Sequence, residues 1–305
     1  MGEGSMASEE KIKPFCDGYI HVLGLGASAI PVFQGLRSNI EKKNQDRKWI
    51  NYWRLWSFSL VPSGLELYKW DAQRNFGEED MLFLLVDTAD KASVQNAEQI
   101  GQCENPNNIG YPIIFAFLLG DGEQDARERI ASAVDCFVDL RNVQLKQNKR
   151  QETVKQLVYI FISSILAPFE GDQMVGMGFD DIQKMFSHGD EIHFGVGHAV
   201  LERPEDDVCM VVAKEATREL EAQCNLRSIR RAFLSIEQGT LGSLFYLHEA
   251  ASEIAKSMDE NCDFYFNTSV IPNMKEDRVR AVLFATEAPI TKRPPLSFEA
   301  GRDNL

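Results

Sequence analysis

The 305-residue chain lacks the cysteine and nucleophile patterns that define several enzyme classes. Its six cysteines form no CxxC pair, so the sequence predicts neither a zinc site nor a disulfide framework. It also lacks a Walker A lysine motif and any Ser/His/Asp or Cys/His nucleophile set. We therefore expect no metal ligands, and the scattered cysteines favour a reducing, cytoplasmic location.

Basic charge and long apolar runs are scarce as well. The 32 Lys and Arg residues against 46 Asp and Glu give a net charge of −14, which argues against a nucleic-acid groove, because phosphate binding needs clustered basic residues. The longest apolar blocks, near Leu157–Pro168 and Tyr111–Leu119, fall well short of the roughly 20 residues of a membrane-spanning helix. We expect no direct membrane insertion.

The first half of the chain alternates strand and helix patterns. Tyr19–Leu25 predicts a strand that runs through a glycine turn into a helix over Val32–Lys42. Met81–Val86 and Pro112–Leu119 are apolar throughout, as strands buried on both faces are. Arg127–Asp139 has helical spacing, and Val138–Val143 is a candidate for a further short strand. This alternation predicts an α/β domain with a Rossmann-like, doubly wound parallel sheet.

An almost entirely apolar helix follows at mid-chain, and we expect it to join two domains. Beyond it, the pattern predicts a smaller α+β domain of about four strands with two helices. The expected segments are a disordered expression-vector remnant over 1–10, an α/β domain of nucleotide-binding type over 11–150, the central helix over 151–170, an α+β domain over 171–287 and a flexible tail over 288–305.

A glycine motif follows the first strand and opens the first helix. It consists of Gly24, Leu25, Gly26, Ala27 and Ser28, and such a turn lets backbone amides approach a phosphate. The plainer alternative is a tight turn that needs glycine for backbone reasons alone. A dinucleotide site would also need an acidic residue after the next strand, and Trp56–Ser59 contains none.

Two adjacent aspartates, Asp180 and Asp181, stand where a glycine-rich loop meets a short helix. Paired carboxylates could activate water or hold a metal ion. Alternatively, Asp180 caps the helix and Gln183 completes a capping box, and we favour this interpretation.

Three stretches of the second half carry a family resemblance. They are Gly178–Phe186, Ile192–Ala199 and Asn261–Glu287, and in order and spacing they resemble the bacterial cell-division protein FtsZ of the tubulin superfamily. The resemblance spans roughly residues 151–287, whereas the first half agrees in outline only. It implies a tubulin/FtsZ-like architecture with two domains around a central helix.

The resemblance also implies a GTP site, and the chain departs from the family there. Asp87 and Thr88 stand where FtsZ-like chains begin a glycine-rich phosphate loop, and the carboxylates of Asp87 and Asp90 would repel a triphosphate unless a cation intervened. Binding of GTP or GDP is therefore expected to be weak or absent, with Mg²⁺ only alongside nucleotide. Glu152 lies near the position of a family guanine contact.

The catalytic loop also departs from the FtsZ-like pattern. Asp181 matches the second aspartate of the family's catalytic loop, whereas Gly176 and Gly178 replace its polar residues. We accordingly expect a cytoskeletal, cell-division or membrane-remodelling protein of prokaryotic type. It would self-associate head to tail or co-assemble with an active tubulin-like partner.

Two enzymes remain as alternatives. One is an active GTPase in which Asp87, Asp90 and Asp181 hold a metal ion that restores the lost contacts. The other is a dinucleotide-dependent enzyme that uses the first glycine motif.

Overall fold

The computed structural model of the chain describes eleven segments. They are residues 20–45, 56–61, 80–102, 112–141, 147–170, 172–173, 177–186, 189–201, 208–239, 247–271 and 274–286. The strands are β1 Ile20–Leu25, β2 Trp56–Val61, β3 Met81–Asp87, β4 Ile113–Leu119, β5 Cys136–Asp139, β6 Asp172–Gln173, β7 Asp190–Val200, β8 Arg231–Gln238, β9 Asp263–Val270 and β10 Arg278–Thr286. The α-helices are α1 Ala29–Gln45, α2 Lys91–Gly101, α3 Gln124–Ala133, α4 Gln147–Glu170, α5 Phe179–Met185, α6 Val208–Glu221 and α7 Leu247–Ser257.

The strands join side by side in the order β2-β1-β3-β4-β5-β7-β10-β8-β9-β6. The first five are parallel, as expected for apolar strands linked by helical crossovers. β7 links the two halves: it pairs in parallel with β5 over only two residues and antiparallel with β10 along most of its length. The sheet therefore changes from parallel to mixed at the boundary between the halves.

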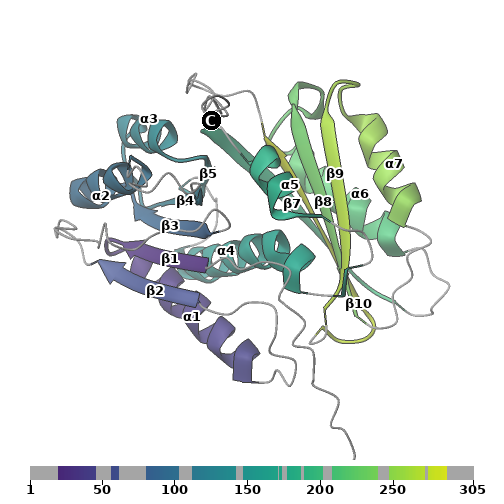
Figure 1. The fold of residues 1–305 in the computed structure, drawn as a ribbon, viewed down its shortest axis with the longest axis horizontal. Helices are drawn as coiled ribbons and strands as arrows, with labels where there is room; N and C mark the ends of the chain where they lie inside the picture. The colour runs from purple at the N-terminus through teal and green to yellow at the C-terminus, as the bar shows by residue number, and fades with distance from the viewer. Residues whose placement is uncertain are drawn as a thin grey trace, which may run out of the picture.

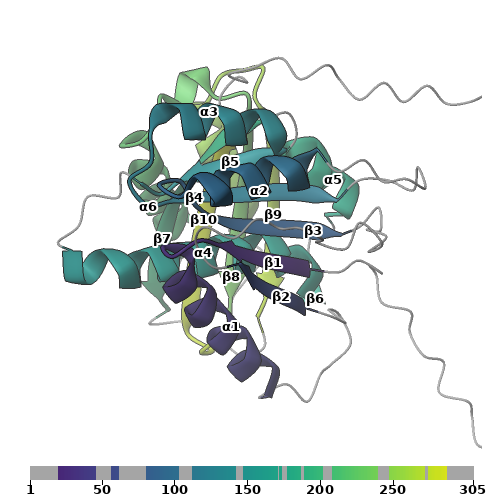
Figure 2. The same ribbon diagram turned by 90° about the vertical axis from the view of Figure 1, so that its left-hand side faces the viewer.

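Helices cover both faces of each half (Figures 1 and 2). In the first half, α2 and α3 pack on the leucine-rich face of β1, β3 and β4, while α1 and α4 cover the phenylalanine-rich face. In the second half, α6 and α7 cover one face, and α4 lies against β8 and β9 from the other side. The helix α4 thus lies between the two halves of the molecule (Figure 1).

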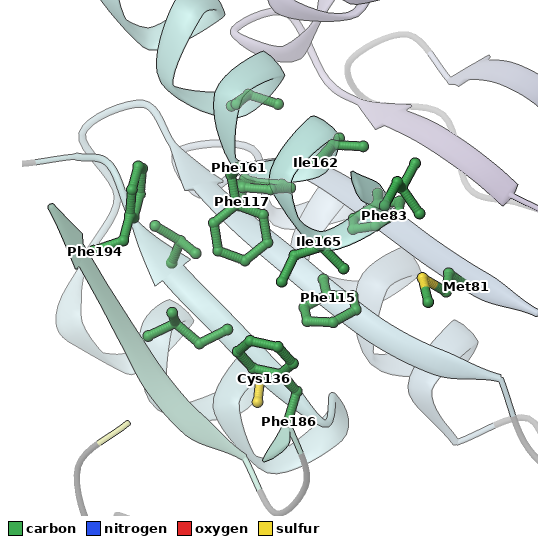
Figure 3. Close-up of a cluster of buried hydrophobic side chains, with 14 of the residues drawn as sticks. Met81, Phe83, Phe115, Phe117, Cys136, Phe161, Ile162, Ile165, Phe186 and Phe194 are labelled. Atoms are coloured by element: carbon green, nitrogen blue, oxygen red, sulfur yellow. The ribbon is translucent and has the colours of Figure 1, made fainter. Parts of the chain in front are cut away.

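The side chain of Phe161 on α4 contacts both halves. The ring of Phe161 is fully buried, with its centroid 5.1 Å from that of Phe117 and 5.9 Å from that of Phe115, both on β4. On its other side it lies 5.5 Å from Phe194 of β7 and 5.1 Å from Phe284 of β10, and all four contacts are edge-to-face. Figure 3 shows Phe161 at the centre of this cluster. One core therefore spans both halves.

The C-terminal turns of α4 meet the second half through polar groups. Pro168 lies inside the helix and has no N–H to donate to the carbonyl of Ser164 four residues earlier. The hydroxyl of Ser235 on β8 approaches that carbonyl at 3.4 Å instead. The Ser164 hydroxyl in turn donates to the buried carboxylate of Glu237, which is also paired with Arg280. These contacts define the polar seam between α4 and the second sheet.

Two glycines of β7 allow α6 to rest directly on the strand. A Cβ on Gly195 would lie 1.9 Å from the carbonyl oxygen of Ala216, and one on Gly197 would lie 1.9 Å from that of Val212. No real side-chain atom tolerates such a distance. The glycines of this stretch therefore serve helix–sheet packing.

The fold class is as predicted, a parallel α/β half, a central helix and an α+β half. The bounds differ at one place: α3 ends at Ala133, short of the expected Asp139, and the short strand expected over Val138–Val143 begins earlier, as β5 over Cys136–Asp139. The central helix begins at Gln147, ahead of the expected 151. The segments 1–10 and 288–305 lie outside the described residues.

Replacing Phe161 by alanine is expected to lower the free energy of unfolding by about 3–5 kcal/mol, because it leaves a cavity between the two halves of the sheet. Urea unfolding followed by circular dichroism measures the loss. Val211→Ala on α6 is the control, because Val211 is 57% exposed and its truncation should change little. Equal losses in the two variants would contradict a central role for Phe161.

Gly195→Ala is expected to destabilise the protein by about 1–3 kcal/mol, since the new methyl group meets the backbone of α6. Gly35→Ala on α1 is the control, because there the nearest atom to the new Cβ is the side-chain Cδ of Lys155 at 3.1 Å, which can move away. Thermal unfolding of both variants tests the difference. A tolerated alanine at position 195 would show that α6 does not rest on β7.

Candidate functional site

The carboxyl ends of β1, β3 and β4 meet at one edge of the parallel sheet, where α/β proteins commonly bind ligands. A cavity of about 430 Å³ opens there, beside the N-terminal part of α4. It is lined by Ala27, Ser28, Pro31, Val32, Leu119, Gly120, Asp121, Leu140, Gln151 and Val154. The volume is within the range of small-molecule sites.

The first glycine turn forms one wall of this cavity. Gly26 adopts a φ of 87°, which favours glycine, and its N–H donates to the carbonyl of Val61 at 2.9 Å. The chain then turns through Ala27 and Ser28 into α1, and the carbonyls of Gly26 and Ala27 accept from the first turn of the helix. The backbone N–H of Ser28 points across the turn toward β3.

A carboxylate receives that N–H group. Asp87, the last residue of β3, is only 5% exposed. Its Oδ2 accepts from the Ser28 N–H at 2.8 Å and its Oδ1 from the Ala89 N–H at 3.2 Å. Two positive-φ glycines enclose it: a Cβ on Gly26 would lie 2.6 Å from the Cβ of Asp87, and one on Gly120 would lie 2.5 Å from its Oδ1. We call this enclosure, formed by Gly26, Ser28, Ala89 and Gly120, the Asp87 cradle.

The residues after Asp87 are engaged within the chain as well. The Thr88 hydroxyl donates to the carbonyl of Leu119 at 2.7 Å and accepts from the Gly122 N–H at 3.1 Å, so it ties the ends of β3 and β4 together. Asp90 is the N-cap of α2, and its Oδ1 accepts from the Ala92 N–H at 3.3 Å. A carboxylate of the chain therefore occupies the N-terminus of α2 too.

The structure brings together most of the residues predicted for a nucleotide site, although few of them face the cavity. Ala27 and Ser28 line it, while Gly24, Leu25 and Gly26 lie behind them in the strand and turn. Asp87 and Thr88 are buried beside it. Glu152 is exposed and does not line the cavity; its carboxylate lies 3.4 Å from the Nζ of Lys155.

Two polar residues that line the cavity were not among the expected contacts: Asp121 was missed, and Gln151 stands next to Glu152, the residue expected to make the contact. Asp121 follows β4, and Gln151, rather than its neighbour Glu152, faces the cavity from α4. Asp121 could have been predicted, because it comes directly after a buried parallel strand whose carboxyl end must lie beside that of β3. The choice between Gln151 and Glu152 depends on the rotation of α4 about its axis.

The aspartates of the glycine-rich loop have a different arrangement from the one predicted. Gly178 is the N-cap of α5, and both aspartates lie inside the helix, so the assignment of Asp180 as cap with Gln183 was wrong. Asp181 supplies the capping carboxylate, accepting from the Gly178 N–H at 3.0 Å. Asp180 is exposed in the first helical turn. Glycine permits this shift because it caps helices nearly as well as threonine does.

The aspartates of α5 and the cavity lie at opposite ends of α4. The 24 residues of this helix span about 36 Å at 1.5 Å per residue. The cavity adjoins its N-terminal turns, and α5 follows its C-terminal end (Figure 2). Asp180 and Asp181 therefore cannot reach the cavity of their own chain. Within the described segments, no three His, Cys, Asp or Glu side chains gather so as to hold a metal ion.

Comparisons by sequence identify no relative, since neither a family model nor a curated protein matches the chain. Solved structures do match. The W319Y mutant of FtsZ from M. jannaschii has a TM-score of 0.65 at 12% identity, over 89% of this chain and 91% of that one. CetZ1 from Haloferax volcanii, a GDP-bound monomer, has a TM-score of 0.60 at 10% identity, over 90% of this chain and 96% of that one.

TubZ of Bacillus thuringiensis serovar israelensis, in GDP-form protofilaments, has a TM-score of 0.58 at 11% identity, over 90% of each chain. The chain has the FtsZ/tubulin-like fold. The similarity covers both halves of the molecule and the central helix between them. The Asp87 cradle lies in the first half and α5 in the second. No helix among the described residues combines the length and apolar character needed to cross a membrane.

Asp181→Ala is expected to lower the free energy of unfolding by about 0.5–1 kcal/mol, because the Gly178 N–H loses its capping acceptor and the helix dipole loses a compensating charge. Asp180→Ala removes an equal charge without a capping contact and is expected to cost less. Urea unfolding at low salt distinguishes them. Equal losses would mean that the capping bond contributes nothing.

Proposed function

We propose that this protein is a structural, assembly-forming protein of the tubulin type. It associates with itself head to tail or enters assemblies of an active tubulin-like partner, in prokaryotic cell division or membrane remodelling. Nucleotide hydrolysis is not its contribution. The likeness of the whole chain to FtsZ, CetZ and TubZ, the last of which is seen in protofilaments, supports this proposal.

One structural observation carries the proposal: α4 holds two different surfaces at opposite ends of one body. The first surface surrounds the cavity at its N-terminal turns, and the second is the face around α5. Because Phe161 packs against strands of both halves, these ends keep a fixed relation. Contact between unlike ends of successive copies adds subunits in one direction, which gives an open filament.

The charge on α5 favours the same role. Asp180 is exposed in the first turn of α5 and has no described partner that holds it in place. A carboxylate at the end of a subunit can contact donors of the next copy without first breaking a bond within its own chain. Asp180 is therefore the residue of this face that is most readily tested.

Purified protein is expected to sediment as species larger than a monomer as its concentration rises, and to show filaments by electron microscopy, with or without GTP. Asp180→Lys should weaken assembly at least tenfold in critical concentration, because it reverses charge at the contact. Glu253→Lys is the matched control: it makes the same change on α7, at the lateral edge of the molecule (Figure 1), where only an exposed pair with Lys256 is lost.

Monomers at every concentration, with and without nucleotide, would contradict self-assembly. If such monomers then join filaments of an active tubulin-like protein, the co-assembly form of the proposal holds. Equal weakening by Asp180→Lys and Glu253→Lys would remove the α5 face from the contact. Rapid release of phosphate from GTP, abolished by Asp181→Ala, would establish an enzyme in place of a structural protein.

A further inference from the structure

The fold implies a guanine nucleotide, and the residues at the carboxyl ends of β1 and β3 can be tested against its phosphates. A phosphate group at such a site is held by backbone N–H groups at the start of a helix, with glycines that let the backbone come close. This chain has the start of α1 and the close glycine turns at Gly26 and Gly120. What those turns enclose is the carboxylate of Asp87.

The N–H group of the first turn that could bind an external anion already donates to a carboxylate of the chain. The Ser28 N–H directly precedes α1 and donates to Asp87 Oδ2 at 2.8 Å, a normal length for a charge-assisted bond. An N–H group has one hydrogen to give, so a phosphate oxygen would have to displace the carboxylate. Asp90 makes the corresponding contact at the start of α2. Neither helix start retains the arrangement that accepts an external anion.

The lack of space around Asp87 and the negative charge near it both disfavour the binding of a phosphate. Asp87 is 5% exposed and is enclosed by backbone on two sides, so it has little room to turn away. A phosphate in the neighbouring cavity would meet this negative charge and that of Asp121, which lines the cavity. Like charges at short range in a partly dry site disfavour binding. The residues present therefore do not fit a nucleoside di- or triphosphate.

We propose that Asp87 is a built-in substitute for phosphate. Its carboxylate fills the anion site of the first turn and ties β3 to the start of α1, as a bound phosphate group would. It holds both glycine turns in their closed form without nucleotide. This inference deepens the proposed function, because it makes assembly independent of nucleotide, yet it concerns the Asp87 cradle alone and is tested without filaments.

Isothermal titration with Mg²⁺–GDP and with tripolyphosphate measures binding to wild type, Asp87→Gly, Asp87→Asn and Asp121→Asn. Wild type is expected to show no saturable binding at millimolar ligand. Asp87→Gly should bind both ligands at least tenfold more tightly than wild type, because it frees the Ser28 N–H and the enclosed space. Asp121→Asn is the matched control: it removes the same charge beside the cavity while leaving the Asp87 cradle intact, so its gain in affinity should be clearly smaller than that of Asp87→Gly.

Micromolar binding of GDP by wild type would overturn the proposal, as would an equal gain for Asp87→Gly and Asp121→Asn, which would show a general effect of charge. If Asp87→Gly fails to fold, Asp87→Asn keeps the size of the side chain and still removes the charge. It should gain affinity more than Asp121→Asn does, and a smaller or equal gain would count against the proposal.

A measurement that involves no ligand gives an independent test. Amide hydrogen exchange, followed by NMR without ligand, should find the Ser28 amide protected at least tenfold more than in Asp87→Asn, whose neutral amide oxygen is a weaker acceptor. Equal and rapid exchange in the two proteins would mean that the carboxylate does not occupy the site. This outcome overturns the role of Asp87 even if the protein forms filaments, whereas monomers with a protected Ser28 amide would overturn assembly alone.

Discussion

The burial of Phe161 between the two halves of the sheet is the contact on which the architecture depends. Its ring meets aromatic side chains of β4, β7 and β10, so the core that the two halves share is built around α4. A fully buried ring makes many weak contacts whose sum is large, and it makes them with both halves at once. The link between β5 and β7 is only two residues long and could not hold the halves together by itself. The cavity and α5 keep their relative places through this core.

Much of the fold could be predicted, because its elements have clear hydrophobic periods. β3 and β4 are apolar throughout, and α4 is marked by its length and its scarcity of polar residues. The start of β5 was placed two residues too late because Arg127–Asp139 contains neither Gly nor Pro to mark where α3 ends. Periodicity alone does not separate a short buried strand from the last turns of a helix.

The site was harder to predict than the fold, because its geometry depends on contacts between distant segments. The sequence placed Asp87 beside the first turn, but it could not indicate that the carboxylate would accept from Ser28, 59 residues away. It predicted a cap at the start of α5, yet the choice of Gly178 over Asp180 depends on where the helix begins. The packing of the folded chain decides which carboxylate accepts from which N–H and at which residue a helix begins. The order of residues along the sequence does not specify that packing.

The glycines of β7 have a consequence for how a chain of this kind changes over time. Gly195 and Gly197 matched a motif of the second half, and they are needed there because α6 lies against bare backbone. That requirement comes from packing within the second half and not from the cavity at the other end of α4. Substitutions around the cavity can therefore accumulate without disturbing the contact between α6 and β7.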